Sequence, residues 1–224
     1  METLKPILAA VLTVGFSYLF GSLNSAITVC RIWKKVDIRD YGSHNAGLTN
    51  VLRVFGKGPG LATLLLDLFK GIIAVVVCRL IVTLAMDVTF FGDSLFIGYV
   101  AGLAVMLGHV FPVYYHFHGG KGVLVTATTL LAIDPLTCVL CLTVFGLIVA
   151  ISKYVSLGSI LSAITYPLLT LLLQGLRGID GFGINAMMAC IFMLLIIFLH
   201  RANIVRLKNG TENKLSFGGK NKQS

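Results

Sequence analysis

Charged side chains are scarce in this sequence: only 12% of the 224 residues are Asp, Glu, Lys or Arg, whereas 57% are hydrophobic. A balance of this kind excludes an ordinary soluble domain. Several apolar runs approach the roughly 20 residues that a helix needs to cross the hydrocarbon core of a bilayer. The composition therefore predicts an integral membrane protein.

Cysteine is also sparse, and its placement argues against a disulfide framework. The five cysteines lie in or beside apolar segments, where cysteine behaves as a small hydrophobic residue. Cys138 and Cys141 form a C-x-x-C pair, but no histidine or further cysteine lies near them, which disfavours a redox or metal role. We expect no metal site, no nucleotide site and no cofactor.

Processing and repeat signals are missing as well. The apolar run after Lys5 continues to Phe20 instead of stopping at a small-residue cleavage site, so it is predicted to be a retained span and not a signal peptide. No tandem repeat and no second domain can be separated. The whole of 1–224 is read as one membrane-embedded domain, with 205–224 as a basic cytoplasmic tail.

The distribution of Lys and Arg predicts how the chain crosses the membrane. Basic residues crowd the first polar segment, 31–57, and the tail from 201 onward, which places both in the cytoplasm and the N-terminus outside. The turn 87–93 has no Lys or Arg and fits the outside. The long apolar segments are roughly 6–30, 60–85, 94–115, 135–151, 155–174 and 184–200.

Parity requires one further helix. Both the glycine turn at 116–122 and Lys153 favour the inside, so the interval between them must cross the membrane twice or not at all. Asp134-Pro135 divides that interval and leaves an apolar piece at 122–133, about 18 Å long as a helix against a core of about 30 Å. We therefore predict an all-α protein with seven transmembrane helices, one short or partial, and a cytoplasmic C-terminus.

Four polar clusters interrupt the apolar sequence, and this topology places all of them on the cytoplasmic side. They are YGSHNAGLTNVLRVFG at 41–56, GGKG at 119–122, KYVSLGS at 153–159 and HRANIVRLKNGTENK at 200–214. Glycine turns, a helix N-terminus and fixed cations together make an anion site, and phosphate is the natural ligand.

Each polar group also has a structural explanation. Glycine turns connect membrane helices, serines cap them, and positive charge is expected at an inner membrane face. His109 and His200 fit interfacial positions at span ends. Asp67 and Lys70, three residues apart, are either an intramembrane ion pair or a functional pair. The break at 21–25 fits either close helix packing or a cavity wall.

The four clusters resemble, in order and spacing, the motifs of the bacterial acyl-phosphate:glycerol-3-phosphate acyltransferases, the PlsY family. GSHNAGLTNVLRVFGKGPGLATLLLDLFKG, GHVFPVYYHFHGGKGV, KYVSLGSI and HRANIVRLKNGTENK carry the resemblance, which covers nearly the whole chain. One position departs from the pattern: His44 stands where the first motif of the family usually has glycine. The role of His44 and the geometry of this turn are therefore open.

The resemblance implies an enzyme of the inner (plasma) membrane whose active site faces the cytoplasm. It would transfer a fatty acyl group from acyl phosphate to the sn-1 hydroxyl of glycerol 3-phosphate, giving lysophosphatidic acid and phosphate. This reaction is the first acylation of bacterial phospholipid synthesis. The expected partners are the two substrates and membrane lipid, with no nucleic acid. A monomer is compatible with the sequence, which does not determine the oligomeric state.

Matching positions carry the roles of family residues onto this chain. The catalytic candidates are Ser43, Arg53, Lys121, Asn203, His200 and Glu212. The substrate-binding candidates are Asn45, Thr49, Asn50, His109, Gly119, Gly120, Gly122, Ser156 and Ser159. By this resemblance, Ser43, Arg53, Lys121 and one of the two serines would contact phosphate groups. The three glycines would let the backbone approach the acyl phosphate.

The sequence lacks two familiar devices of acyl transfer. No histidine has an aspartate five positions later, as soluble-type glycerolipid acyltransferases do, and no G-x-S-x-G elbow occurs. Acyl phosphate has a good leaving group, so positioning and charge neutralisation can supply most of the acceleration. We hypothesise that the phosphate of glycerol 3-phosphate is the base. The alternative class is a secondary transporter for an anionic metabolite, but no inverted repeat is evident.

Overall fold

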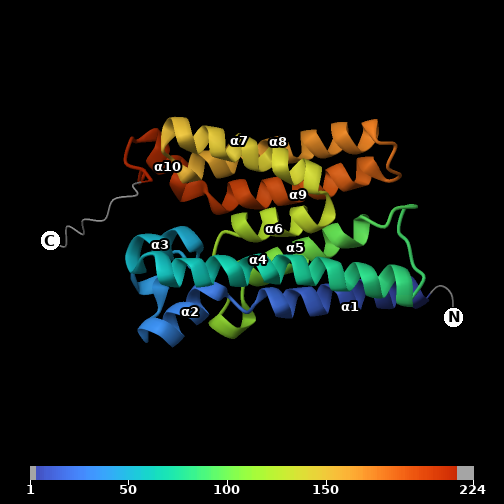
Figure 1. Cartoon of the computed structure of the whole chain (residues 1–224), viewed down its shortest axis with the longest axis horizontal. Helices are drawn as coiled ribbons and strands as arrows, with labels where there is room; N and C mark the ends of the chain where they lie inside the picture. Colours follow the sequence, from blue (N-terminus) through green and yellow to red (C-terminus); the bar gives the residue numbers. More distant parts are fainter. Residues whose placement is uncertain (1–3, 216–224) are drawn as a thin grey trace.

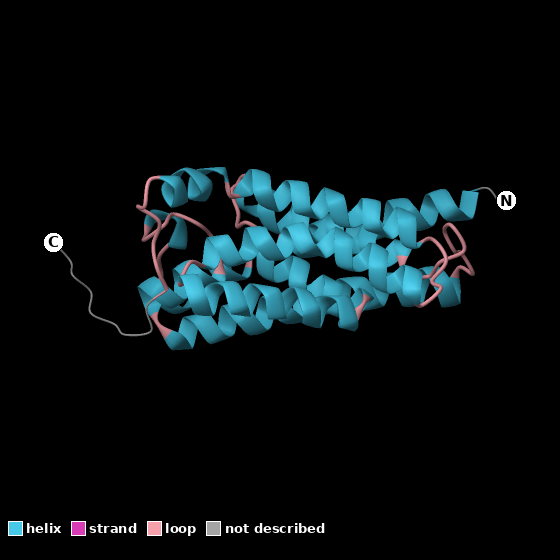
Figure 2. Ribbon diagram, turned by 90° about the horizontal axis from the view of Figure 1, so that it is seen from above, coloured by secondary structure: helices cyan, strands magenta, loops and turns pink. Residues whose placement is uncertain are grey.

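The computed structural model describes residues 4–215, and the helices in this range lie roughly along one long axis (Figures 1 and 2). Within it, the only β structure is an isolated bridge between Phe90 and Asp93. The start of α1 and the loop after α4 lie at one end of the bundle, while α3 and α10 lie at the other (Figure 1). The end of the predicted tail, beyond residue 215, lies outside the described residues.

Six helical segments are long and apolar enough to cross a membrane, and a shorter apolar helix accompanies them. The spans are Leu4–Lys34, Lys57–Ala85, Phe96–Tyr115, Pro135–Ser152, Val155–Leu176 and Phe182–Leu199. The helices are α1 (Leu4–Gly21), α2 (Ser25–Lys34), α3 (Leu48–Phe55), α4 (Lys57–Leu80), α5 (Phe96–Val110), α6 (Val123–Ile133), α7 (Pro135–Ser152), α8 (Val155–Leu176), α9 (Phe182–Leu199) and α10 (Arg201–Lys208). The predicted all-α membrane fold with one short helix is confirmed.

The break between α1 and α2 serves close helix packing. A Cβ atom on Gly21 would lie 2.3 Å from the carbonyl oxygen of Val105, and one on Gly108 would lie 2.2 Å from that of Tyr18. Only glycine lets α1 and α5 approach this closely. Asn24 restarts the chain as α2, because its side-chain oxygen accepts a hydrogen bond from the amide of Ile27 at 3.1 Å.

The core and the periphery of the bundle are both apolar. Tyr99, Met106, Leu130, Tyr166 and Phe192 are among the side chains buried where α5, α6, α8 and α9 meet. Large apolar side chains also cover the outside of the helices, among them Leu8, Leu65, Leu142 and Leu168. Helices that are hydrophobic on every side are typical of membrane spans.

The glycine turn explains why α6 is short. After the surface turn at 113–118, the chain folds back along the end of α5, where the amides of Gly119 and Gly120 donate to the carbonyl oxygens of Val110 and His109 at 3.0 and 3.2 Å. Only then does α6 begin, with Gly122 packed against Met106. The residues 119–122 are thus a re-entrant loop, and it places Lys121 inside the bundle.

A second group of polar side chains joins the helices toward the end of the bundle that lies opposite α3 and α10. We name it the Asp134 network. Asp134 caps α7, and its Oδ2 atom accepts hydrogen bonds from Thr137, Gln174 and Arg177 at 2.8, 3.1 and 2.5 Å. The Asn185 amide donates to Gln174 and to Asp93 at 3.0 and 2.5 Å. The network consists of Asp93, Tyr99, Asp134, Thr137, Gln174, Arg177 and Asn185.

Candidate active site

The first polar cluster is a loop whose shape is held by Asn50. The side-chain oxygen of Asn50 accepts a hydrogen bond from the amide of Ser43 at 2.9 Å, and its NH2 group donates to the carbonyl oxygens of Tyr41 and Asn45 at 2.9 and 3.1 Å. Asn50 is buried on α3, while Ser43 and Arg53 are exposed. Asn50 therefore shapes the loop that presents Ser43 and Arg53.

His44 accommodates a backbone conformation that glycine adopts more easily. Its φ angle is 58°, in the left-handed region, and this accounts for the glycine that the family motif usually has here. Its Nδ1 atom donates to the carbonyl oxygen of Arg39 at 2.9 Å. This local hydrogen bond opposes the cost of the strained backbone, so the turn is kept although glycine is absent.

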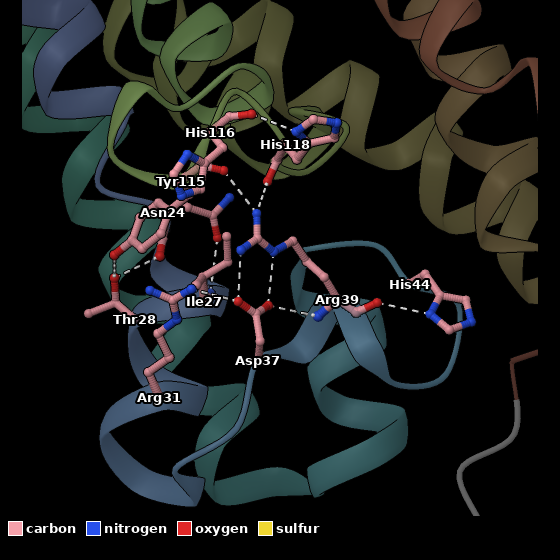
Figure 3. A network of polar contacts seen from close by, with 10 residues as sticks. All are labelled: Asn24, Ile27, Thr28, Arg31, Asp37, Arg39, His44, Tyr115, His116 and His118. Atoms are coloured by element: carbon pink, nitrogen blue, oxygen red, sulfur yellow. Dashed lines mark hydrogen bonds and ion pairs between the residues drawn. The ribbon is translucent and has the colours of Figure 1, made fainter.

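Arg39, which the sequence did not single out, ties the first loop to the turn that precedes the glycine loop (Figure 3). Its guanidinium forms a fork on Asp37, with N···O distances of 2.9 and 2.8 Å, and its Nη1 atom donates to the carbonyl oxygens of Tyr115 and His118 at 2.9 and 3.0 Å. The hydrogen bonds from Arg39 hold the pKa of Asp37 well below its usual range. This paired cation therefore fixes one loop against the other.

The three glycines of the re-entrant loop are required by packing within the protein. A Cβ atom on Gly119 would lie 2.0 Å from the carbonyl oxygen of His109, and one on Gly120 would lie 2.3 Å from the His109 ring. Gly122 has a φ angle of 74° and faces Met106. Sequence analysis assigned these glycines to the approach of a substrate; their first role is to let the loop enter the bundle.

The N-terminus of α6 offers backbone donors beside this loop. The first helical hydrogen bond runs from the amide of Thr126 to the carbonyl oxygen of Gly122 at 2.8 Å, and Gly122 provides no side-chain cap. Among the described residues, the amides of Val123 and Leu124 therefore have no backbone partner. Such an end of a helix favours an anion.

Lys121, Asn203, Glu212 and Ser156 form one hydrogen-bonded chain that joins three of the four clusters. Lys121 donates to the side-chain oxygen of Asn203, whose NH2 group donates to Glu212 at 2.7 Å. Glu212 also accepts from Ser156 at 2.9 Å and from Arg206 at 2.7 Å. Burial opposes ionisation of Glu212, yet these three donors keep its pKa below the ordinary value.

The two serines of the third cluster differ in their contacts. The Ser156 hydroxyl donates to Glu212, whereas the Ser159 hydroxyl donates to the carbonyl oxygen of Val155 in its own helix at 2.9 Å. Both side chains line the same cavity. Ser156 is thus the serine that belongs to the Lys121 chain.

Lys121 and His200 both have pKa values lowered by burial. Burial and the nearby positive charge of Arg206 lower the pKa of Lys121 to about 8, although Glu212 opposes this shift. Burial and the charge of Lys121 lower the pKa of His200 to about 4. At neutral pH, Lys121 is therefore mostly charged and His200 is neutral.

The neutral His200 ring has a defined tautomer. Its Nδ1 atom lies 2.8 Å from the carbonyl oxygen of Ile196, and since a carbonyl only accepts, Nδ1 carries the proton. The Nε2 atom therefore presents a lone pair. His200 can accept a hydrogen bond from a hydroxyl group in the cavity, but it has no second N–H group to donate to an anion.

A cavity of about 330 Å³ brings the four clusters together. Its wall contains thirteen of the fifteen candidates; Gly119 and Gly120 lie behind it and support the loop. The thirteen are Ser43, Asn45, Thr49, Asn50, Arg53, His109, Lys121, Gly122, Ser156, Ser159, His200, Asn203 and Glu212. Asp67, which the sequence offered as either an ion pair or a functional pair, also lines the cavity, as do Arg206 and Asn213, which were not among the candidates. Arg206 and Asn213 lie inside the fourth motif, which was the available signal.

The cavity also has an apolar part, formed by α6, α7, α8 and α9. It runs past Leu130 on α6 and Phe145 on α7 to Tyr166 on α8. From Ser156 to Tyr166 the α8 helix advances by about 15 Å. The polar mouth thus continues into a space lined by hydrophobic side chains.

Two cations of the polar mouth have no counter-charge. Arg206 pairs with Glu212 at 2.7 Å, and Asp67 pairs with Lys70 at 2.9 Å. Arg53 and Lys121 form no ion pair with any residue of the described range 4–215. In the same range, no group of three His, Cys, Asp or Glu side chains is placed to hold a metal ion. The arrangement is suited to an anion with an apolar substituent.

The fold defines a multi-span membrane protein whose helical bundle holds a cavity with a polar mouth and an apolar interior. The family model described as glycerol-3-phosphate acyltransferase matches residues 11–210, and the chain belongs to this family. The protein is accordingly an integral membrane acyltransferase of phospholipid synthesis.

Relatives and solved structures agree with this assignment. Glycerol-3-phosphate acyltransferases of Clostridioides difficile and Halalkalibacterium halodurans are 39% and 42% identical, over 96% and 92% of this chain and 98% and 94% of theirs. A crystal structure of PlsY, an integral membrane glycerol 3-phosphate acyltransferase, is similar to this chain. In its glycerol 3-phosphate form it superposes on this chain with a TM-score of 0.77 and is 35% identical to it in sequence. It covers 92% of this chain and 96% of its own. The lysophosphatidic acid form has a TM-score of 0.75.

Proposed function

We propose that this protein transfers a fatty acyl group from acyl phosphate to the sn-1 hydroxyl of glycerol 3-phosphate. The observation that carries the proposal is the pair of uncompensated cations, Arg53 and Lys121, in a cavity that continues into an apolar space. Two phosphate groups have separate cationic partners there, and the acyl chain has an apolar wall. PlsY structures that hold glycerol 3-phosphate and lysophosphatidic acid support this choice of acceptor and product.

In this reaction, the sn-1 oxygen attacks the acyl carbon, and the bond between that carbon and the phosphate oxygen breaks. The products are lysophosphatidic acid and inorganic phosphate. Lys121 and the amides at the start of α6 face the charge that grows on the departing phosphate, and Arg53 with Ser43 holds the phosphate of the acceptor. Donors fixed in advance in a site of low dielectric are the strongest form of such stabilisation.

The phosphate of glycerol 3-phosphate takes the hydroxyl proton in this proposal. Its second pKa, about 6, suits a base that works at neutral pH. His200, one of the two histidines that line the cavity among the described residues, presents a lone pair on Nε2, but burial lowers the pKa of its ring to about 4, which makes it a weak base. His200 therefore orients the hydroxyl group, and the substrate provides the base.

The site faces the cytoplasm in this proposal, in the inner membrane and with the N-terminus outside. The helices α2 and α10, which carry Arg31, Lys34, Arg201 and Arg206, lie at the same end of the bundle as α3 (Figure 1), which agrees with the distribution of positive charge at inner faces. Labelling of a cysteine at position 121, in a variant without the native cysteines, tests the orientation. Reaction with an impermeant reagent from the periplasmic side would contradict it.

The function is tested by following phosphate release from palmitoyl phosphate with purified protein in a lipidic phase. Release is expected only when glycerol 3-phosphate is present, together with equal amounts of lysophosphatidic acid. Palmitoyl-CoA as the sole donor is expected to give little product; comparable turnover with it would overturn the donor assignment. A transporter would move the metabolite across a vesicle membrane without releasing phosphate.

Plain glycerol tests the substrate base. It lacks the phosphate, so it is expected to react with a much lower kcat even at saturation, as well as with a higher KM. His200→Ala is expected to leave measurable turnover. A kcat for glycerol within a few-fold of that for glycerol 3-phosphate would require a base from the protein.

A further inference from the structure

A compact ionic cluster lies behind the re-entrant loop and takes no part in the proposed chemistry. It consists of Ser25 on α2, Asp67 and Lys70 on α4 and His109 on α5, all at most 4% exposed. Asp67 Oδ1 accepts hydrogen bonds from the Ser25 hydroxyl at 2.7 Å and from Lys70 at 2.9 Å. Ionisable groups inside membrane spans are costly, which makes a function for this cluster worth seeking.

The contacts of Lys70 determine the protonation of the His109 ring. An ammonium group has three N–H donors and no acceptor. In this cluster the three donors find three acceptors: Asp67 Oδ1 at 2.9 Å, the carbonyl oxygen of Leu23 at 3.2 Å and His109 Nδ1 at 3.3 Å. The Nδ1 atom of His109 therefore accepts, and the proton of the neutral ring resides on Nε2.

The Nε2–H group of His109 faces the site without a partner in the protein. The His109 ring lines the cavity, and its Nε2 atom lies against Gly120, the residue before Lys121. Among residues 4–215, the His109 ring forms its side-chain contacts through Nδ1, and Nε2 forms no hydrogen bond. Nε2 is not among the buried polar atoms that lack a partner, which agrees with an atom open to the cavity, and an oxygen of a bound anion could accept its hydrogen bond.

The two cavity histidines are complementary. The Nδ1–H group of His200 is bound to a backbone carbonyl, so its Nε2 atom accepts. The Nδ1 atom of His109 is bound to an ammonium group, so its Nε2 atom donates. A hydroxyl group suits the first ring and an anionic oxygen suits the second.

We propose that His109 donates a hydrogen bond from Nε2 to a phosphate group held at the re-entrant loop, and that the Asp67–Lys70 pair keeps its ring in the donating tautomer. The inference rests on the proposed function for the identity of the phosphate, which belongs either to the acyl donor or to glycerol 3-phosphate. His109 is then a residue that contacts the substrate, and Lys70 is a positioning residue.

Nitrogen NMR of the ¹⁵N-histidine-labelled protein in detergent tests the tautomer without any turnover. The His109 resonances, assigned with His109→Gln, are expected to show a protonated Nε2 and an unprotonated Nδ1, and Lys70→Met is expected to mix the two tautomers. Inorganic phosphate is expected to shift the Nε2 resonance. A ring protonated on Nδ1, or an Nε2 resonance that saturating phosphate leaves unchanged, would overturn the proposal.

Kinetics show which phosphate is bound. His109→Leu removes the donor, and its KM for one of the two substrates is expected to rise about ten- to a hundredfold, as for a lost hydrogen bond to a charged group. His109→Gln places an NH2 group near the position of Nε2 and is expected to recover most of that loss. The substrate whose KM changes identifies the phosphate.

Tyr99→Phe is the matched control, because Tyr99 is also a buried polar residue of α5 but does not line the cavity. It is expected to leave both KM values unchanged. A rise in KM for Tyr99→Phe equal to that for His109→Leu would show a general effect on α5 and would refute the proposal. If acyl transfer itself were absent while phosphate still shifted the His109 resonance, the proposed function would fail and this inference would stand.

Discussion

Polar side chains are buried at two places in this bundle, and the two differ in how their charges are satisfied. In the Asp134 network, Asp134 pairs with Arg177 at 2.5 Å, and Asp93 accepts from the Asn185 amide. At the cavity, the exposed Arg53 and the partly buried Lys121 form no ion pair within the described chain, and Nε2 of His109 forms no hydrogen bond there. Buried polarity alone does not mark a site; charges and donors left free beside a cavity do.

The loops that bound the cavity are held in the same way as the Asp134 network. The oxygen and the NH2 group of the Asn50 side chain both form hydrogen bonds within the first loop. The Arg39 guanidinium donates to Asp37 and to the carbonyl oxygen of Tyr115, and so joins two loops. Asn50 and Arg39 thus build the walls with paired polar groups, whereas Arg53 and Lys121 line the cavity without an ion-pair partner in the described range. Substitutions in the two kinds of region are expected to change different quantities.

The largest effect is expected for Lys121→Met, which removes an uncompensated cation of the cavity. Loss of one such group from a pre-organised site lowers kcat/KM by about a hundred- to a thousandfold. The melting temperature in detergent is expected to change little, because the hydrogen bond to Asn203 is lost together with a partly buried charge that has no ion-pair partner. Activity above one tenth of wild type would place the phosphate elsewhere.

The next effect is expected at the Asp134 network, in stability instead of activity. Asp134→Ala removes an acceptor of three side-chain hydrogen bonds and the N-cap of α7. The free energy of unfolding in mixed detergent is expected to fall by about 2–4 kcal/mol. Both KM values of the folded fraction are expected to remain within twofold of wild type. A selective rise in KM would link this network to the site.

A smaller effect is expected for Arg39→Lys, which keeps the charge but loses the fork and the contact with the two carbonyl oxygens. The KM for glycerol 3-phosphate is expected to rise about tenfold, since two hydrogen bonds between loops are lost. Arg31→Ala is the control, because Arg31 also pairs with Asp37 at 2.8 Å but donates to no carbonyl of the second loop. Equal effects of both variants would assign the result to Asp37 alone.

The smallest effect is expected from pH. The pKa of Lys121 is about 8, so its ammonium group loses its proton as the pH rises through that value, and phosphate loses a cation. Between pH 7 and 8.5, the KM is expected to rise about fourfold. In Lys121→Arg the guanidinium stays charged, so the profile is expected to be flat over this range. A wild-type KM that does not change up to pH 9 would contradict the role of the ammonium group.

The sequence predicted the membrane spans well, because an apolar run of sufficient length identifies a span without any knowledge of contacts with distant residues. Apolar length gave the six spans, and Asp134-Pro135 with the glycine turn gave the short α6. The candidate residues came from motifs, and most of them line one cavity.

Contacts between distant loops could not be predicted in the same way. In the sequence, Arg39 is one of several basic residues in the same segment and nothing distinguishes it from them. Its hydrogen bonds to the carbonyl oxygens of Tyr115 and His118 depend on the fold. The tautomers of His109 and His200 likewise depend on partners that no spacing rule reveals. His44 was recognised as unusual, but its compensating hydrogen bond required the coordinates.

The continuity of the polar mouth with the apolar part of the cavity has a consequence for kinetics. A donor whose chain rests among lipids is encountered by diffusion in two dimensions, whereas glycerol 3-phosphate arrives from bulk water. With acyl phosphate as the donor, as proposed, the rate should therefore follow its mole fraction in the bilayer and the molar concentration of the acceptor. Adding inert phospholipid to a constant amount of donor should slow the enzyme, although the donor concentration per volume of sample stays the same.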